Sequence, residues 1–317
     1  MNAHRFPTAS TDLANRASLP TGPGLGQQQY AAAEVDKIIL GKMLAQVAVV
    51  PMPGVDTITV VAHGGDSAML AALRGTVTGR TLRLEGTLPF KPGTARTSGS
   101  VNYIGGNVTV TGMTVINGRV VSGTTVTGSG SLGDTVILDG REVDLDRSIQ
   151  LVVVIPARLD LAVRDLIGAV GITDDLAGFL DFAPSVRCDL VAAGVNDFEG
   201  ELRGSGRVTV AAVAFDADVQ VTGSGTCVLG SVAGAADLKI SGSGDVTVQG
   251  GTTTRLRAQV TGSGDIRHGG TVTGKARLRV SGSGDIRVHT VTGEVDQGVA
   301  GSGEITANGQ TYRPRWH

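Results

Sequence analysis

The sequence has 317 residues, a formal net charge of −2 and a pI near 6.2, so its charge indicates neither nucleic acid nor an anionic membrane as a partner. Its hydrophobic content of 41% is ample for a buried core, which excludes a wholly disordered chain. The 48 glycines do not recur at every third position, which excludes collagen. Glycine combined with many Val and Thr residues favours short strands joined by tight turns.

Residues 1–34 read as a flexible polar tail, because they contain Pro, Gly and polar residues and lack the apolar segment of a secretion signal. The apolar stretch Ile38–Val50 is interrupted by Gly41, Lys42 and Gln46, so it is too short and too polar to cross a bilayer. The sequence as it stands therefore predicts a cytoplasmic protein without membrane insertion. A cell-envelope location is the alternative if a leader precedes the first residue.

Residues 35–145 are expected to form an irregular N-terminal β or solenoid region with capping elements. Asp66–Leu73 predicts one or two helical turns, and Asn117-Gly118 predicts a hairpin between two strands. Gly128, Gly130 and Gly133 satisfy the pattern G-x-G-x-x-G, but a strand sequence follows in place of a helix. We therefore predict no dinucleotide site there and no cofactor elsewhere.

Residues 146–317 are expected to form regular coils. Ile149–Ile155 predicts a fully buried strand that ends at Pro156, and residues 163–182 fit either degenerate coils or a short helix. From residue 198 onward the triplet Gly-Ser-Gly recurs at steps of 19, 19, 20, 20 and 19 residues. Its two glycines are, in successive repeats, Gly204 and Gly206, Gly223 and Gly225, Gly242 and Gly244, Gly262 and Gly264, Gly282 and Gly284, and Gly301 and Gly303.

Every second residue on both sides of these triplets is apolar, which is the period of a strand with one buried face. Two residues before the first glycine, for example, stand Leu202, Val221, Ile240, Val260, Val280 and Val299. One such pair of strands cannot bury its apolar face, whereas a stack of them can. The repeat therefore predicts an all-β fold, a β-solenoid of about 19–20 residues per coil. The glycines form its corners, and residues 311–317 form a C-terminal cap.

A column of carboxylates is the strongest candidate for chemistry. Asp245, Asp265, Asp285 and Glu304 each stand three residues after a corner glycine. At a strand spacing of about 4.8 Å, neighbouring carboxylates repel by about 1 kcal/mol in water, so the column must face solvent or hold a cation. Arg267 and Arg287 can neutralise it without a metal. We therefore favour a solvated Asp/Arg ladder and keep weak cation binding at these four residues as the alternative.

The other reactive residue types favour structural roles. His268 occupies a slot that Val248 and Val288 fill in neighbouring coils, so it is expected in the core. Cys227 likewise replaces an aliphatic residue, and with Cys188 it forms no CxxC motif, so neither a zinc site nor a disulfide framework is indicated. The Thr-rich segments 252–254, 271–273 and 290–292 are interpreted as outward strand positions, with an ice-binding array as a remote alternative. We predict no catalytic residue.

The "SGSGDI/V" units at Ser241–Val246, Thr261–Ile266 and Ser281–Ile286 resemble the bacterial domain family described as putative auto-transporter adhesin, head GIN domain. The similarity extends to Ile58–Gly86 and Arg141–Asp165 and covers roughly residues 35 to 310. The resemblance implies a single-stranded right-handed parallel β-helix without a recognised active site, and a role in adhesion or the cell envelope.

We therefore expect a non-enzymatic, adhesin-like solenoid that presents a repeated polar surface to a protein or glycan partner, with a homo-oligomer left open. One alternative is an intracellular scaffold that polymerises end to end. A less favoured alternative is a carbohydrate-active enzyme of the polysaccharide-lyase type. Such an enzyme needs a groove, and no insertion between corners exceeds one residue, so we expect none in the repeats.

Overall fold

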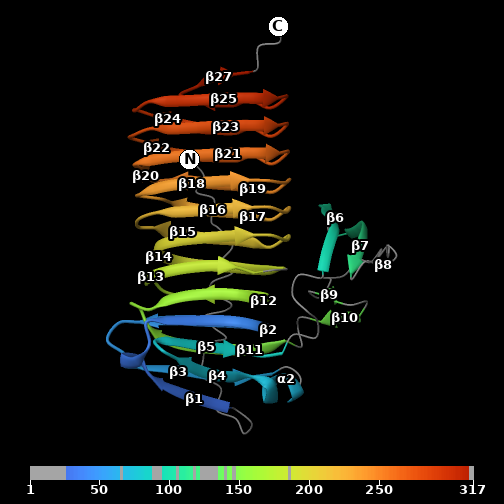
Figure 1. The fold of residues 1–317 in the computed structure, drawn as a ribbon, viewed down its shortest axis with the longest axis vertical. Helices are drawn as coiled ribbons and strands as arrows, with labels where there is room; N and C mark the ends of the chain where they lie inside the picture. Colours follow the sequence, from blue (N-terminus) through green and yellow to red (C-terminus); the bar gives the residue numbers. More distant parts are fainter. Residues whose placement is uncertain are drawn as a thin grey trace.

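The computed structural model describes residues 26–64, 67–87, 95–104, 107–116, 119–121, 135–138, 141–144, 148–184 and 187–313. Most of these residues form one tall stack, in which coils of the chain lie above one another (Figure 1). The all-β solenoid predicted from the repeat is therefore confirmed.

Each coil of the C-terminal half supplies one strand before its Gly-Ser-Gly corner and one after it. We call the sheet of preceding strands face A and the sheet of following strands face B. Face A contains residues 198–202 of β14 (Cys188–Leu202), then β16 (Ala217–Val221), β18 (Ala235–Ile240), β21 (Arg255–Gly262), β23 (Ala276–Gly282) and β25 (Val295–Gly301). Face B contains residues 188–195 of β14, then β15 (Arg207–Val213), β17 (Thr226–Ser231), β19 (Asp245–Gly250), β22 (Ile266–Val272), β24 (Ile286–Val291) and β26 (Ile305–Ala307).

Neighbouring coils pair in parallel through equivalent residues, so like side chains lie above one another. On face A, Ile240 pairs with Val260, which pairs with Val280; all three side chains are buried. On face B, Val246, Ile266 and Ile286 form a second buried column. Burying each such side chain contributes about 1.5–3 kcal/mol, and no coil could obtain this contribution alone.

A short third stretch closes each coil of the repeat region. β20 (Thr252–Thr253) pairs with Thr271 and Val272 at the end of β22. Its inward column, which the sequence analysis did not identify, contains Val213, Val232, Thr253, Val272 and Val291, all buried.

In the first coils, the order of the strands along the stack differs from their order in the sequence. β2 (Lys37–Met52) contributes to both faces and lies between β11 (Ile149–Pro156) and β12 (Asp160–Ile172), pairing in parallel with each. On face A, β5 (Thr81–Glu85) also pairs with β2. In β2 and β12 the chain bends at a non-glycine residue in the left-handed region, at Lys42 (φ 50°) and Asp165 (φ 49°).

Antiparallel strands lie at both ends of the stack. At the N-terminal end, β1 (Gly26–Ala31) pairs with β3 (Thr57–His63), and β4 (Arg74–Thr78) pairs with β5. β1 and the 3-10 turn η1 (Ala32–Glu34) fall within residues 1–34, which the sequence assigns to a tail; the pairing with β3 gives residues 26–31 their strand conformation. At the C-terminal end, β27 (Gln310–Tyr312) folds back on β26.

Several local predictions have clear outcomes. The helix α2 (Ser67–Ala72) and the buried strand β11, which ends at Pro156, are confirmed. Within residues 163–182, β12 and β13 (Leu176–Ala183) are strands that pair in parallel with each other, so the structure shows the degenerate coils rather than the helix. Two small antiparallel sheets lie outside the stack: β6 (Ala95–Ile104), β7 (Asn107–Ile116) and β8 (Arg119–Val121) form one, and β9 (Thr135–Leu138) and β10 (Arg141–Asp144) form the other.

The predicted hairpin is confirmed by the pairing of Ile116 with Arg119. Its tip, Asn117-Gly118, lies outside the described residues, as do Gly128, Gly130, Gly133 and Trp316.

Candidate functional site

The predicted corner glycines lie one above another. The carbonyl oxygen of Gly262 accepts hydrogen bonds from the N–H groups of both Ser283 (2.9 Å) and Gly284 (3.1 Å) in the next coil. This close approach leaves no room for a side chain, because a Cβ on Gly284 would lie 1.9 Å from the carbonyl oxygen of Gly264. The glycines therefore serve as corners of the coil, as the sequence predicts.

The carboxylate column forms the predicted ladder. The backbone N–H of Asp265 donates to the carboxylate of Asp245 (3.0 Å), that of Asp285 to Asp265 (2.9 Å), and that of Glu304 to Asp285 (2.9 Å). Each aspartate of the column therefore accepts a hydrogen bond from the backbone of the next coil and holds two coils at the strand spacing.

Two arginines neutralise this column. Arg267 donates to Asp265 at 2.6 Å, and Arg287 donates to Asp285 at 2.7 Å and lies 3.7 Å from Asp265. Within the described ranges, no group of three or more His, Cys, Asp or Glu side chains has a geometry suited to a metal ion. Cation binding by the column thus stays an untested alternative, and the ladder itself serves as a structural element.

His268 is buried in the core, as predicted, and it has a polar partner there. Its Nε2 lies 2.8 Å from Oγ1 of Thr253, and both side chains are at most 1% exposed. Burial lowers the pKa of His268, so the imidazole is neutral at pH 7. The interpretation of segment 252–254 as outward is wrong for Thr253, whose side chain points inward and is buried. Thr252 and Thr254 are exposed, as expected.

We expect Thr253→Val to destabilise the protein by about 1–3 kcal/mol, because it leaves a buried imidazole nitrogen without its partner. The double variant Thr253→Val/His268→Val should return to wild-type stability or exceed it. In neighbouring coils Val248 occupies the position of His268, and Val272 occupies the position of Thr253. Urea unfolding followed by circular dichroism measures both values. A double variant as unstable as Thr253→Val would contradict the polar pairing.

The two cysteines have no features of reactive thiols. Cys227 and Cys188 are at most 1% exposed, and burial raises the pKa of the Cys227 thiol to about 12. Cys188 also has a raised pKa, through burial and the nearby Asp189. Both thiols stay protonated at neutral pH, so they pack as small apolar side chains, as expected for Cys227.

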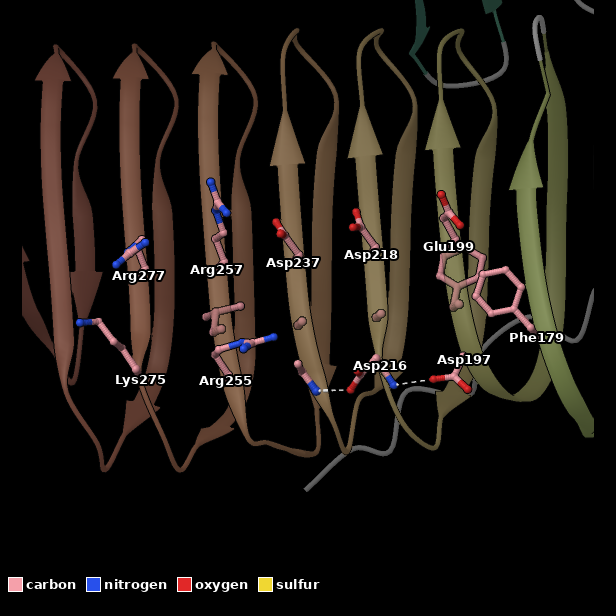
Figure 2. Close-up of a pocket in the computed structure, with 15 residues that line it drawn as sticks. Phe179, Asp197, Glu199, Asp216, Asp218, Asp237, Arg255, Arg257, Lys275 and Arg277 are labelled. Atoms are coloured by element: carbon pink, nitrogen blue, oxygen red, sulfur yellow. Dashed lines mark hydrogen bonds between the residues drawn. The ribbon is translucent and has the colours of Figure 1, made fainter.

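An open groove of about 680 Å³ lies on face A, across the strands from β13 to β23. Its lining carries charge in two blocks that follow each other along the stack, as Figure 2 shows. The acidic block consists of Asp197, Glu199, Asp216, Asp218 and Asp237. The basic block consists of Arg255, Arg257, Lys275 and Arg277. Phe179 lies at the acidic end.

This groove corrects the expectation that the repeat region builds none. A hollow needs no loop insertion when a small side chain stands between long ones. Ala235 occupies an outward position where the neighbouring coils have Asp216 and Arg255, and all three residues line the groove. Substitution within a regular coil therefore shapes the surface.

The acidic block is held in place by its own backbone bonds. The carboxylate of Asp216 accepts from the N–H of Ala235 (2.7 Å), and that of Asp197 accepts from the N–H of Asp216 (3.1 Å). Asp218 has a raised pKa, chiefly because the groove partly desolvates it and also because of Asp237; Lys239 and Arg257 oppose the shift. An upward shift means that the carboxylate gains from an additional cation.

The basic block is divided between paired and unpaired cations. Lys275 lies 2.9 Å from Glu294, and Arg277 lies 3.2 Å from Asp296. Arg279 also pairs with Asp296 and is the main cause of that carboxyl's lowered pKa. The side chains of Arg255 and Arg257 make no hydrogen bond or ion pair to any residue in the described ranges, and both are exposed. They offer free guanidinium groups at the boundary between the blocks.

Sequence reasoning missed these blocks although the signal was readable. The sequence analysis considered the inward positions around each corner and the outward positions after it, whereas these charges stand five and seven residues before the first corner glycine. At five residues before, the series is Glu199, Asp218, Asp237, Arg257, Arg277 and Asp296.

The stacked parallel coils define the chain as a β-solenoid repeat protein. Residues 187–311 match the family described as "Putative auto-transporter adhesin, head GIN domain", which confirms the resemblance over that segment. No curated protein matches the chain.

Solved structures share the fold over most of the chain. One from Parabacteroides distasonis, described as a putative lipid binding protein, has 16% identity and a TM-score of 0.56, and the match covers 90% of this chain and 98% of that one. A putative adhesin from the same organism has 14% identity and a TM-score of 0.54, with 89% and 96% covered. A putative adhesin from Parabacteroides merdae has 13% identity and a TM-score of 0.52, with 90% and 97% covered. At these identities the likeness establishes the fold alone.

Proposed function

We propose that the chain is a non-enzymatic, adhesin-like binding module that docks a charged partner on the groove of face A. The observation that carries this proposal is the ordered separation of charge. Five carboxylates and four cations line one open groove on a rigid stack, and Arg255 and Arg257 stand there without partners in the described part of the chain. The family description of residues 187–311 as an adhesin supports the same role.

A protein partner fits this surface better than a glycan. Blocks of both signs along one groove complement a surface that also carries both signs, and electrostatic complementarity provides specificity and a fast encounter. A glycan of uniform charge would meet repulsion in one block. Glycan binding is therefore the second outcome of the test below rather than the first expectation.

Beads coated with the full chain test the proposal. They are applied to surfaces that carry the same chain, extracellular-matrix proteins, or anionic and neutral glycans. We expect saturable adhesion to at least one protein surface, reduced at least tenfold by Arg255→Ser/Arg257→Ser because the groove loses its free cations. Arg267→Ser on face B is the matched control and should retain adhesion. Adhesion that is absent from every surface, or unaffected by the double variant, would contradict the proposal.

The two alternatives from the sequence analysis have distinct readouts. Conversion of an acidic polysaccharide to unsaturated uronate products, followed by ultraviolet absorbance, would show a lyase and overturn the non-enzymatic assignment. Filaments in negative-stain images would show an end-to-end scaffold. We expect neither, since in the described coils the groove consists of side chains on regular strands and β27 folds back on β26 at the C-terminal end.

The family description also supports an envelope location over the cytoplasmic location expected from the sequence. In the described part of the chain, no helix is long and apolar enough to span a bilayer. Cell fractionation tests the location. Recovery with the envelope supports this part of the proposal, and recovery in the cytosol would contradict it.

A further inference from the structure

The charges that line the groove on face A change sign at one place in the stack. The outward residues of β14, β16 and β18, with Asp216 directly before β16, carry the acidic block. Those of β21 and β23, with Lys275 directly before β23, carry the basic block. Lys239 of β18 is a cation in the acidic half, outside the groove lining, and lies 3.2 Å from Asp237. Because successive coils pair in register, equivalent side chains are separated by about 4.8 Å per coil. The boundary between β18 and β21 therefore divides the groove into two halves of opposite sign (Figure 2).

A surface with this pattern is complementary to itself. We propose that a second copy of this chain docks on face A with its stack running in the opposite direction, about a two-fold axis parallel to the strands and between β18 and β21. This proposal rests on the proposed function, since it names the partner of the same groove.

The rotation places opposite charges together. Asp237 meets the partner's Arg257, Asp218 meets the partner's Arg277, and Asp216 meets the partner's Lys275; symmetry repeats each pair. A two-fold axis along the stack would instead set each coil against its own equivalent, with carboxylates facing carboxylates. The sign change therefore selects the antiparallel arrangement over the parallel one.

The outer coils set the limit of the interface. There Glu199 would face the partner's Asp296, and Asp197 would face the partner's Glu294, which is unfavourable. In their own chain, however, Asp296 already pairs with Arg277 and Arg279, and Glu294 pairs with Lys275. The six strands from β14 to β25 span about 24 Å, and six residues of strand span about 20 Å, so one face offers roughly 500 Å². Stable complexes bury about 800 Å² per partner, so the dimer should be weak and salt-sensitive.

Sedimentation velocity of the full chain tests the pairing. At 50 mM NaCl we expect a concentration-dependent dimer, and at 500 mM NaCl a monomer. Asp237→Arg and Arg257→Asp should each weaken the dimer at least tenfold, because each places like charges together twice. Thr247→Asp, on face B, is the control and should leave association unchanged. Circular dichroism and thermal unfolding confirm that every variant is folded.

Mixing the two charge-reversed variants provides the sharpest result. Each reversed side chain then meets an opposite charge in the other variant, so an equimolar mixture should form a heterodimer with an affinity near that of the wild-type dimer. Monomers at all concentrations in low salt, or a mixture that stays monomeric, would overturn the inference. If the chain is monomeric while coated beads still adhere to a matrix protein through Arg255 and Arg257, the proposed function stands and self-pairing fails.

Discussion

Replacing Gly284 with alanine should destabilise the C-terminal coils by more than about 3 kcal/mol, which is a large fraction of the stability of a typical domain. The new Cβ would lie 1.9 Å from the carbonyl oxygen of Gly264, in a corner where Gly262 accepts two backbone hydrogen bonds from the next coil. The corners would have to separate, which breaks those bonds and the register of the adjoining strands.

Urea unfolding followed by circular dichroism measures this loss, and limited proteolysis locates it. Gly250→Ala is the matched control, because a Cβ there would lie 3.7 Å from the carbonyl oxygen of Gly230, an ordinary contact. We expect the control to change stability by less than about 1 kcal/mol. Equal effects of the two substitutions would mean that the corners are not in close contact.

Leu278→Asp should cost more than about 4 kcal/mol at pH 7, since it puts an unpaired charge into the inner column. Leu278 is fully buried and pairs with Ala258 in the coil before it and Gln297 in the coil after it. Burial would raise the pKa of the new carboxyl in the folded state, so folding favours its protonated form. The loss should therefore be smaller at pH 5 than at pH 8, because stability falls as pH rises through the raised pKa.

Gln259→Asp is the control for this charge. Its side chain points outward between Lys239 and Arg279 of the neighbouring coils, so the carboxylate finds cations and solvent. We expect a change within about 0.5 kcal/mol. A Leu278→Asp variant as stable as Gln259→Asp would place Leu278 at the surface and contradict the inner column.

The sequence could predict the coils because their constraints are local and repeated. Two glycines at fixed spacing, with an apolar residue two before the first and four after it, define a corner between two half-buried strands. These apolar residues are Val, Ile or Leu everywhere except at Cys227. The same register gave the Asp/Arg ladder, since Asp265, directly before β22, and Arg267, within β22, stand two residues apart and share a face. These predictions needed no knowledge of distant parts of the chain.

Features that depend on distant pairing could not be predicted. β2 lies between β11 and β12, strands that follow it by more than a hundred residues, and no local pattern indicates that order. Thr253 lies in a short third stretch whose inward column is visible only when the coil is closed. The groove is lined by side chains from successive coils, such as Asp216, Ala235 and Arg255, and this grouping exists only once the coils are stacked.

The stacking of coils in register is the claim on which the ladder, the groove and the self-complementary face all depend. Double electron–electron resonance between spin labels at the exposed corner serines measures it directly, in a chain with Cys188 and Cys227 replaced by alanine. Ser205 and Ser283 are four coils apart and should give a narrow backbone distance of about 19 Å; Ser205 and Ser302, five coils apart, should give about 24 Å. Broad distributions, or distances that do not grow by one strand spacing per coil, would contradict the account.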